Sequence, residues 1–189
     1  MTAVYIWGFS AKFAVYEPAP GLPSDLLDRN HPRPPRNAWR PPVLVETFEV
    51  RGKRAPPGDF PGTTGFTHLL SPRAVDVMGD VFNRDGIIFP VEVEGQGDGW
   101  YLFHPTTVVD CLDVGASKVT RLPFRPTEIS AVLNPVFRAG VVPSNGLFVV
   151  PECRQGDIYV CEDVKSLAVK HKLKGLVLST SFFGTPWIS

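Results

Sequence analysis

The sequence has few cysteines and no excess of either charge. Its 189 residues include three cysteines, and Lys plus Arg equals Asp plus Glu at 19 each. A disulfide scaffold would need a denser, even-numbered set, so we expect reduced thiols, with a bridge between Cys153 and Cys161 as the open alternative. A chain without a positive field is poorly suited to general nucleic-acid binding, and the same balance argues against an acidic mimic of DNA.

Long hydrophobic runs are also missing. No stretch approaches the roughly 20 apolar residues that a membrane-spanning helix needs. The opening stretch MTAVYIWGFSAKF has an apolar patch, but it lacks the preceding basic region and the small-residue cleavage site of a secretory signal. The sequence therefore predicts a cytoplasmic protein with no membrane partner.

Familiar catalytic and cofactor motifs are absent. The four histidines (31, 68, 104 and 171) are scattered and form no metal-binding pair with one another or with a cysteine. There is no nucleophile elbow, and the glycine-rich EGQGDG lacks the lysine and the following helix of a phosphate-binding loop. We therefore expect a protein that holds no metal or cofactor.

Proline is abundant and unevenly placed. Eleven of the 20 prolines fall between Pro18 and Pro61. Because proline lacks the amide donor and fixes φ, residues 18–62 are predicted to form an irregular surface segment, with one strand at 43–50. It follows an N-terminal strand (3–9) within residues 1–17 and precedes an α+β core over residues 63–189.

Two segments show helical patterns. Ser71 and Pro72 are a typical start for a helix that ends near Asp85–Gly86, with Val75, Met78 and Phe82 facing the core. Residues 161–175 begin with acidic side chains and end with lysines, which predicts a second helix. Its expected inner face is Val164, Leu167, Ala168 and His171.

The rest of the pattern favours short strands. Residues 86–103 alternate in polarity around a glycine-rich turn, which predicts a β-hairpin. Further strands are expected at 118–124, 136–140, 147–152 and 176–178. Two main helices among short, mostly antiparallel strands predict a single α+β domain.

The stretch VVDCLDVGAS (108–117) places a cysteine between two aspartates. On a straight strand Asp110 and Asp113 point to opposite faces, so they would not act as a pair. We therefore expect a structural role: Asp110 accepts backbone N–H groups, Asp113 and Ser117 shape the turn, and Cys111 packs in the core. Asp110 is the residue whose loss we expect to be most damaging.

The order of these motifs resembles that of a bacterial family of polymorphic-toxin immunity proteins, formerly a domain of unknown function. The family pattern V-V-D-x-L-D-x-x-x-S is matched by Asp110, Leu112, Asp113 and Ser117. The family's closing helix and strand are matched by Leu167, Leu173, Gly175 and Leu176. The resemblance covers residues 65–178. It implies a non-enzymatic protein that binds and neutralises a cognate antibacterial toxin.

Two surfaces are candidates for that contact. One is an acidic side of the first helix and the hairpin, and the other is an arginine–tryptophan loop, because tryptophan and arginine are frequent interface anchors. The acidic candidates are Asp76, Asp80, Glu92, Glu94 and Asp98, and the loop candidates are Arg36, Trp39 and Arg40. Two alternatives stay open: a small-ligand enzyme with a site near Asp110, Asp113 and His104, and an adaptor of a secretion machine.

Overall fold

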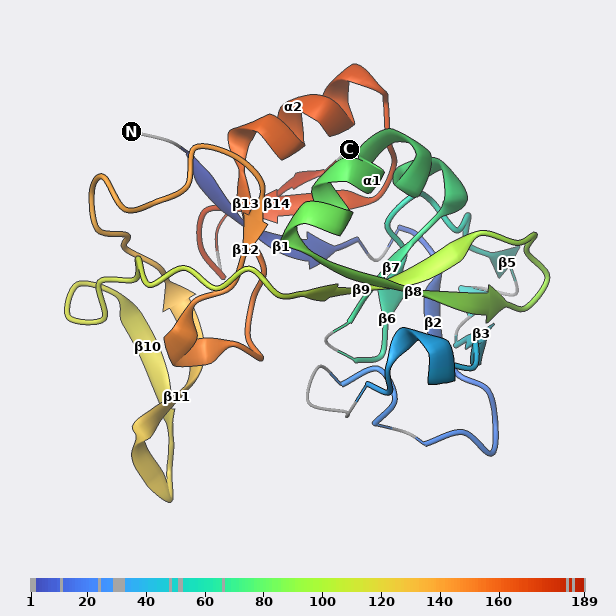
Figure 1. Cartoon of the computed structure of the whole chain (residues 1–189), viewed down its shortest axis with the longest axis horizontal. Coiled ribbons are helices and arrows are strands. Elements are labelled where there is room, and N and C mark those ends of the chain that lie inside the picture. The colour runs from blue at the N-terminus through green and yellow to red at the C-terminus, as the bar shows by residue number, and fades with distance from the viewer. Residues whose placement is uncertain are drawn as a thin grey trace.

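Two β-sheets and two helices enclose the main core (Figure 1). The structure, a computed structural model, describes residues 3–10, 12–23, 25–28, 33–47, 49–50, 53–65, 67–182, 184 and 186–188, with the backbone alone at 36, 49, 50 and 53. The many antiparallel strand pairs and two α-helices confirm the predicted α+β class and single domain.

The first sheet is antiparallel throughout, and the N-terminal strand lies at its centre. This placement confirms the predicted strand at residues 3–9, whose apolar side chains are needed on both faces. In spatial order the sheet contains β12 (Leu147–Phe148), β13 (Tyr159–Cys161), β1 (Val4–Phe9), β14 (Leu176–Ser179) and β15 (Trp187–Ile188).

The second sheet is mixed and includes the predicted hairpin. Two of its neighbouring pairs, β2 with β6 and β3 with β8, are parallel, and the others are antiparallel. In spatial order it contains β6 (Gly62–Thr63), β2 (Val15–Pro18), β3 (Val43–Glu46), β8 (Gly86–Val93), β9 (Trp100–Pro105) and β7 (His68–Leu70). A two-stranded ribbon, β4 (Glu49–Val50) and β5 (Lys53–Arg54), follows β3, so the single strand predicted at 43–50 is in fact two.

Both helices begin where the sequence predicted. Helix α1 (Pro72–Asp85) has Ser71 as its N-cap, and the Ser71 hydroxyl accepts the Ala74 N–H at 3.0 Å. Helix α2 (Glu162–Lys170) is shorter than predicted, because the chain leaves the helix at His171. His171 is exposed, so its placement on the inner face was wrong, while Val164 and Ala168 are buried as expected.

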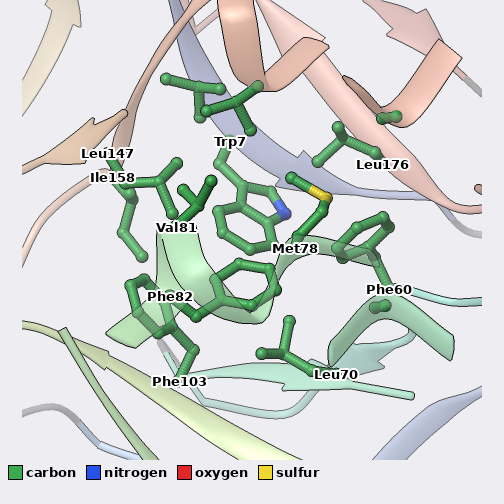
Figure 2. Close-up of a cluster of buried hydrophobic side chains, with 14 of the residues drawn as sticks. Trp7, Phe60, Leu70, Met78, Val81, Phe82, Phe103, Leu147, Ile158 and Leu176 are labelled. Carbon is green, nitrogen blue, oxygen red and sulfur yellow. The ribbon is translucent and has the colours of Figure 1, made fainter. Parts of the chain in front are cut away.

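One apolar cluster joins the two sheets to both helices. Trp7 from β1 lies at its centre, among side chains from α1 and from the second sheet (Figure 2). Its ring lies 5.6 Å from that of Phe60 and 6.1 Å from that of Phe103. Because one core serves every layer, the two sheets cannot unfold independently without exposing it.

The proline-rich segment covers the other face of the second sheet. Strand alternation places Leu70 and Phe103 in the main core, and Leu69 and Leu102 in a second cluster on the opposite face. Leu27 and Trp39, from residues 18–62, complete that second cluster. The segment also contains the 3-10 helix η1 (Arg36–Ala38) and supplies β3 to the sheet, so it contributes to the core as well as to the surface.

A third element projects beyond both sheets: the hairpin of β10 (Lys118–Leu122) and β11 (Arg125–Asn134) (Figure 1). The sequence predicted its first strand but missed its second, where exposed polar residues hide the alternation. The strand predicted at 136–140 was wrong, since Phe137 makes only an isolated bridge to Leu112 there. The strand predicted at 147–152 ends at Phe148 and is followed by a second 3-10 helix, η2 (Pro151–Cys153).

The cysteines and the helix lengths bear on two expectations drawn from composition. The three cysteines are free, so the open alternative of a bridge between Cys153 and Cys161 does not apply. Within the described part of the chain, no helix combines the length and the apolar character needed to cross a bilayer.

Candidate functional site

The projecting hairpin carries an aromatic side chain at its tip. Phe124 is 97% exposed, and Leu122 beside it is 38% exposed. Scattered apolar side chains on a surface need no explanation, but a phenylalanine that contacts almost nothing of its own chain gains no stability from folding. Its position at the end of an extension therefore favours a role in contact with another molecule.

The tip is basic and held in shape by its own arginines. Residues 118–134 contain three basic residues and one acidic residue. The Arg121 guanidinium donates to the carbonyl oxygens of Pro126 and Thr127 at 3.2 and 3.3 Å, across the turn. Arg125 pairs with Glu128 at 3.4 Å, in an exposed contact that water screens. The result is an apolar side chain flanked by positive charge.

The stretch 108–117 forms the root of this hairpin. The Val136 N–H donates to the Ser117 hydroxyl oxygen at 2.8 Å, and the Val136 carbonyl accepts the Asp113 N–H at 2.8 Å. The Asp113 carboxylate also accepts the Ala116 N–H at 3.0 Å, closing the turn before β10. The predicted turn-shaping roles of Asp113 and Ser117 are thus confirmed, and both residues fix the two ends of the hairpin to each other.

Asp110 has a different partner from the one predicted. Its carboxylate accepts from the Arg138 guanidinium at 2.6 Å rather than from backbone N–H groups, and its side chain is 71% exposed. Arg138 also donates to the carbonyl oxygens of Asp110 and Leu112. The hydrogen bond with Asp110 is the main reason that the pKa of Arg138 is raised. Arg138 therefore holds the backbone of the stretch in place, and the Asp110 carboxylate orients the Arg138 guanidinium.

The stretch is not a straight strand, so its side chains do not alternate between two faces. The Cys111 N–H donates to the Val109 carbonyl oxygen at 2.9 Å, closing a three-residue turn centred on Asp110. As a result Cys111 and Leu112, which a strand would place on opposite faces, are both buried. Burial raises the pKa of the Cys111 thiol to about 11, which keeps it protonated and poorly nucleophilic at neutral pH.

The residues of the enzyme alternative have structural contacts. Asp110 is paired with Arg138, Asp113 holds a turn, and His104 lies in β9 opposite Ile87 of β8. Among the residues that the structure describes, no group of three or more His, Cys, Asp or Glu side chains could hold a metal ion.

The two predicted contact surfaces fare differently. The acidic candidates Asp76, Asp80, Glu92, Glu94 and Asp98 are all exposed, on α1, on β8 and in the turn after it. Trp39 is 8% exposed: its indole N–H donates to the Pro90 carbonyl oxygen at 2.7 Å, and its ring packs on Phe89. This burial overturns its placement as an exposed anchor. Arg40 is exposed beside it, and the Arg36 side chain lies outside what the structure describes.

Sequence reasoning also missed two buried carboxylates that connect distant segments. Asp59 accepts from Ser71, Arg73 and the Lys174 N–H, and so ties the start of α1 to the loop before β14. Asp85 accepts from Arg84 and from the Leu147 N–H, at the other end of α1. No sequence motif marks these contacts, because the distant partner lies 115 positions from Asp59 and 62 positions from Asp85.

Gly175, part of the expected closing signature, has a backbone conformation that favours glycine. Its φ is +92°, a conformation that favours glycine, and a Cβ there would lie 3.0 Å from the Phe60 carbonyl oxygen. The exposed Phe124 was missed, although the sequence LPFRP, with an aromatic residue between prolines and next to arginine, was the available signal.

No family model matches the chain, and neither does any curated protein.

Proposed function

We propose that this protein binds a partner protein through the β10–β11 hairpin and neutralises it, as an immunity protein neutralises an antibacterial toxin. The observation that carries the binding is Phe124, 97% exposed at the tip of a hairpin that projects from both sheets. The toxin as partner is supported by the sequence resemblance of residues 65–178. In this proposal the protein acts in the cytoplasm, without a cofactor, by direct contact.

The hairpin has the properties that an inhibitory contact requires. A narrow projection can enter a cleft such as an active site, where a flat surface cannot. Its root is fixed by Asp113, Ser117 and Arg138, so little order has to be imposed on binding. Its three basic residues would raise the rate of association with an acidic cleft.

The expected contribution of the tip can be estimated. Full burial of a phenylalanine side chain contributes about 1.5–3 kcal/mol. Because about 1.4 kcal/mol corresponds to a tenfold change in Kd, Phe124→Ala should weaken binding by about 10- to 100-fold. The same change should leave the free energy of unfolding unaltered, since the side chain makes almost no contact within its own chain.

The test is co-expression with the product of the adjacent gene. That product alone should stop growth, the wild-type chain should restore it, and Phe124→Asp should not. Val169→Ser is a matched control, because Val169 is an exposed apolar residue (53%) on α2, in another part of the fold. Circular dichroism of the purified variants should give equal melting temperatures.

Two results would overturn the proposal for that pair. One is an adjacent product that is harmless alone or remains lethal with an excess of this protein. The other is full protection by Phe124→Asp, which would leave toxin binding possible but remove the hairpin from it.

A further inference from the structure

A continuous groove runs beside the β10–β11 hairpin, from near its tip to the first sheet. Two hollows of about 790 and 500 Å³ share Ser130 and Gly156 in their linings, so they adjoin there. The larger one lies between hairpin residues 121–122 and 127–130 on one side and η2 with the loop after it on the other. The smaller one, which we call the apolar cleft, lies between β11, β6 and the strands β1 and β14. The groove therefore follows the hairpin over most of its length.

The floor of the apolar cleft contains a glycine that its own chain does not require. Gly8 lies in β1 opposite Val177 of β14, and both residues line the cleft. The φ of Gly8 is outside the left-handed region, and a Cβ there would make only ordinary contacts, the shortest at 3.5 Å to Val177. A glycine inside a strand weakens the strand and often marks a place where a ligand or another chain approaches closely. Gly8 therefore leaves room for a side chain from outside.

The apolar cleft and the hairpin tip are complementary in character but cannot meet within one chain. Phe9, in the wall of the cleft, is 54% exposed, and Phe124, at the tip, is 97% exposed. Among the lining residues that the structure describes there is no lysine or arginine, so nothing repels the basic residues that flank Phe124. At about 3.3 Å per residue, Phe124 lies about 20 Å from Ser130 along the hairpin, so the tip does not reach the cleft of its own chain.

A twofold axis brings each tip to the cleft of the other copy. When two hairpins lie antiparallel, the tip of each lies beside the root of the other, where the groove opens into the apolar cleft. A twofold contact is self-complementary, so the same tip and cleft are used twice. A hairpin of about 33 by 10 Å presents about 300 Å² per face, so two hairpins in two grooves bury about 1,200 Å² in total. That area is at the lower end of the range of about 1,200–2,000 Å² that stable interfaces bury.

We propose that the protein forms a symmetric dimer in which the Phe124 tip of each copy occupies the apolar cleft of the other, over Gly8. The two hairpins lie antiparallel in the two grooves. This inference does not depend on the proposed function, because it uses only surfaces of the chain itself. Where both hold, a toxin and a second copy compete for the same tip, so the dimer keeps the apolar tip covered until the toxin is present.

Sedimentation velocity of the purified full chain tests the dimer. The wild-type chain should pass from monomer to dimer between about 1 and 100 µM, as expected for an interface of modest area. Phe124→Asp, and Gly8→Leu, which fills the floor of the cleft, should each weaken association by about 100-fold or more, because each dimer contains the altered contact twice. Gly97→Leu in an exposed turn and Val169→Asp on α2 are the matched controls and should dimerise as the wild type does.

An equimolar mixture of the two variants tests the reciprocal arrangement. The intact tip of Gly8→Leu can enter the intact cleft of Phe124→Asp, so one of the two contacts forms. The mixed dimer should therefore be at least about tenfold tighter than either variant dimer. At about 500 µM the mixture should contain dimer while neither variant alone does.

A thermal melt checks that Gly8→Leu is folded. Ser130→Trp, which blocks the groove from an exposed position, replaces it if it melts early. The proposal is overturned if the wild type stays monomeric at about 500 µM, if the cleft variant dimerises as the wild type does, or if the mixture forms no dimer. Gly8→Leu keeps the tip intact and should still restore growth in the co-expression assay, so loss of the dimer and loss of toxin binding are measured separately.

Discussion

Replacement of Asp59 by alanine should destabilise the protein more than replacement of Asp110 by alanine. The carboxylate is buried and accepts the Ser71 hydroxyl at 3.0 Å, the Arg73 guanidinium at 3.0 Å and the Lys174 N–H at 2.6 Å. The Ser71 hydroxyl is also the N-cap of α1, so Asp59 orients the group that begins the helix. Asp59→Ala therefore removes three acceptor contacts at once.

The size of the effect follows from the burial of each partner. Hydrogen bonds to a charged group contribute about 1.5–3 kcal/mol when buried. Arg73 is half exposed (51%), so its contact with Asp59 is worth under about 1 kcal/mol. The buried bond to Ser71 and the part-buried bond to the Lys174 N–H then dominate, and the free energy of unfolding should fall by about 3 kcal/mol. For a chain of this size, that loss lowers Tm by about 6–12 °C.

Chemical denaturation followed by circular dichroism measures this loss directly. Asp59→Asn keeps the shape but not the charge, and should lose about half as much. Asp76→Ala, which replaces an exposed aspartate on α1, is the matched control, and its free energy of unfolding should stay within about 0.5 kcal/mol of the wild-type value. A loss below about 1 kcal/mol for Asp59→Ala, or one equal to that of Asp76→Ala, would refute this reasoning.

Three further changes test other parts of the fold. Asp110→Asn should lower Tm less than Asp59→Asn, because the contact between Asp110 and Arg138 is exposed and weakened by salt; a thermal melt with and without salt checks this. Gly175→Ala should cost about 1–3 kcal/mol in urea unfolding, since φ is +92° and alanine would crowd a backbone carbonyl. The pKa of Cys111 is raised to about 11, so the folded state keeps the thiol proton to a higher pH than the unfolded state does. The contribution of this thiol to the free energy of unfolding should be fully present below pH 9 and lost between about pH 9 and 11. The free energy of unfolding should therefore fall less steeply over that range in Cys111→Ala.

Local patterns in the sequence predicted those helices and strands that are determined by neighbouring residues. The start of α1 depends on Ser71 and Pro72, which are adjacent, and β8 depends on alternation within one strand. The end of α2 was placed too late because lysines continue past it, while the chain leaves the helix at His171 and turns with a positive φ at Lys172. Charge patterning alone does not locate a helix end.

Features that depend on distant partners could not be read in this way. Trp39 stands among arginines and prolines and looked exposed, yet its indole finds an acceptor at Pro90, 51 positions away. Phe9 and Phe182, from nearly opposite ends of the chain, line one cavity. Straight-strand geometry failed at Asp110 because a three-residue turn, closed by the Cys111 N–H, reverses the expected facing.

We expect the 108–117 stretch to set the direction of the hairpin that carries Phe124. Ser117 both donates to and accepts from Val136, at 3.3 and 2.8 Å, across the hairpin root. Ser117→Ala would keep the Phe124 contact but add the cost of ordering the hairpin on binding, which we expect to weaken binding by about fivefold. Phe124→Ala would lose the contact without loosening the root. Hydrogen exchange separates the two: amides of residues 118–134 should exchange faster in Ser117→Ala and unchanged in Phe124→Ala, and equal exchange in both would mean that the root does not direct the hairpin.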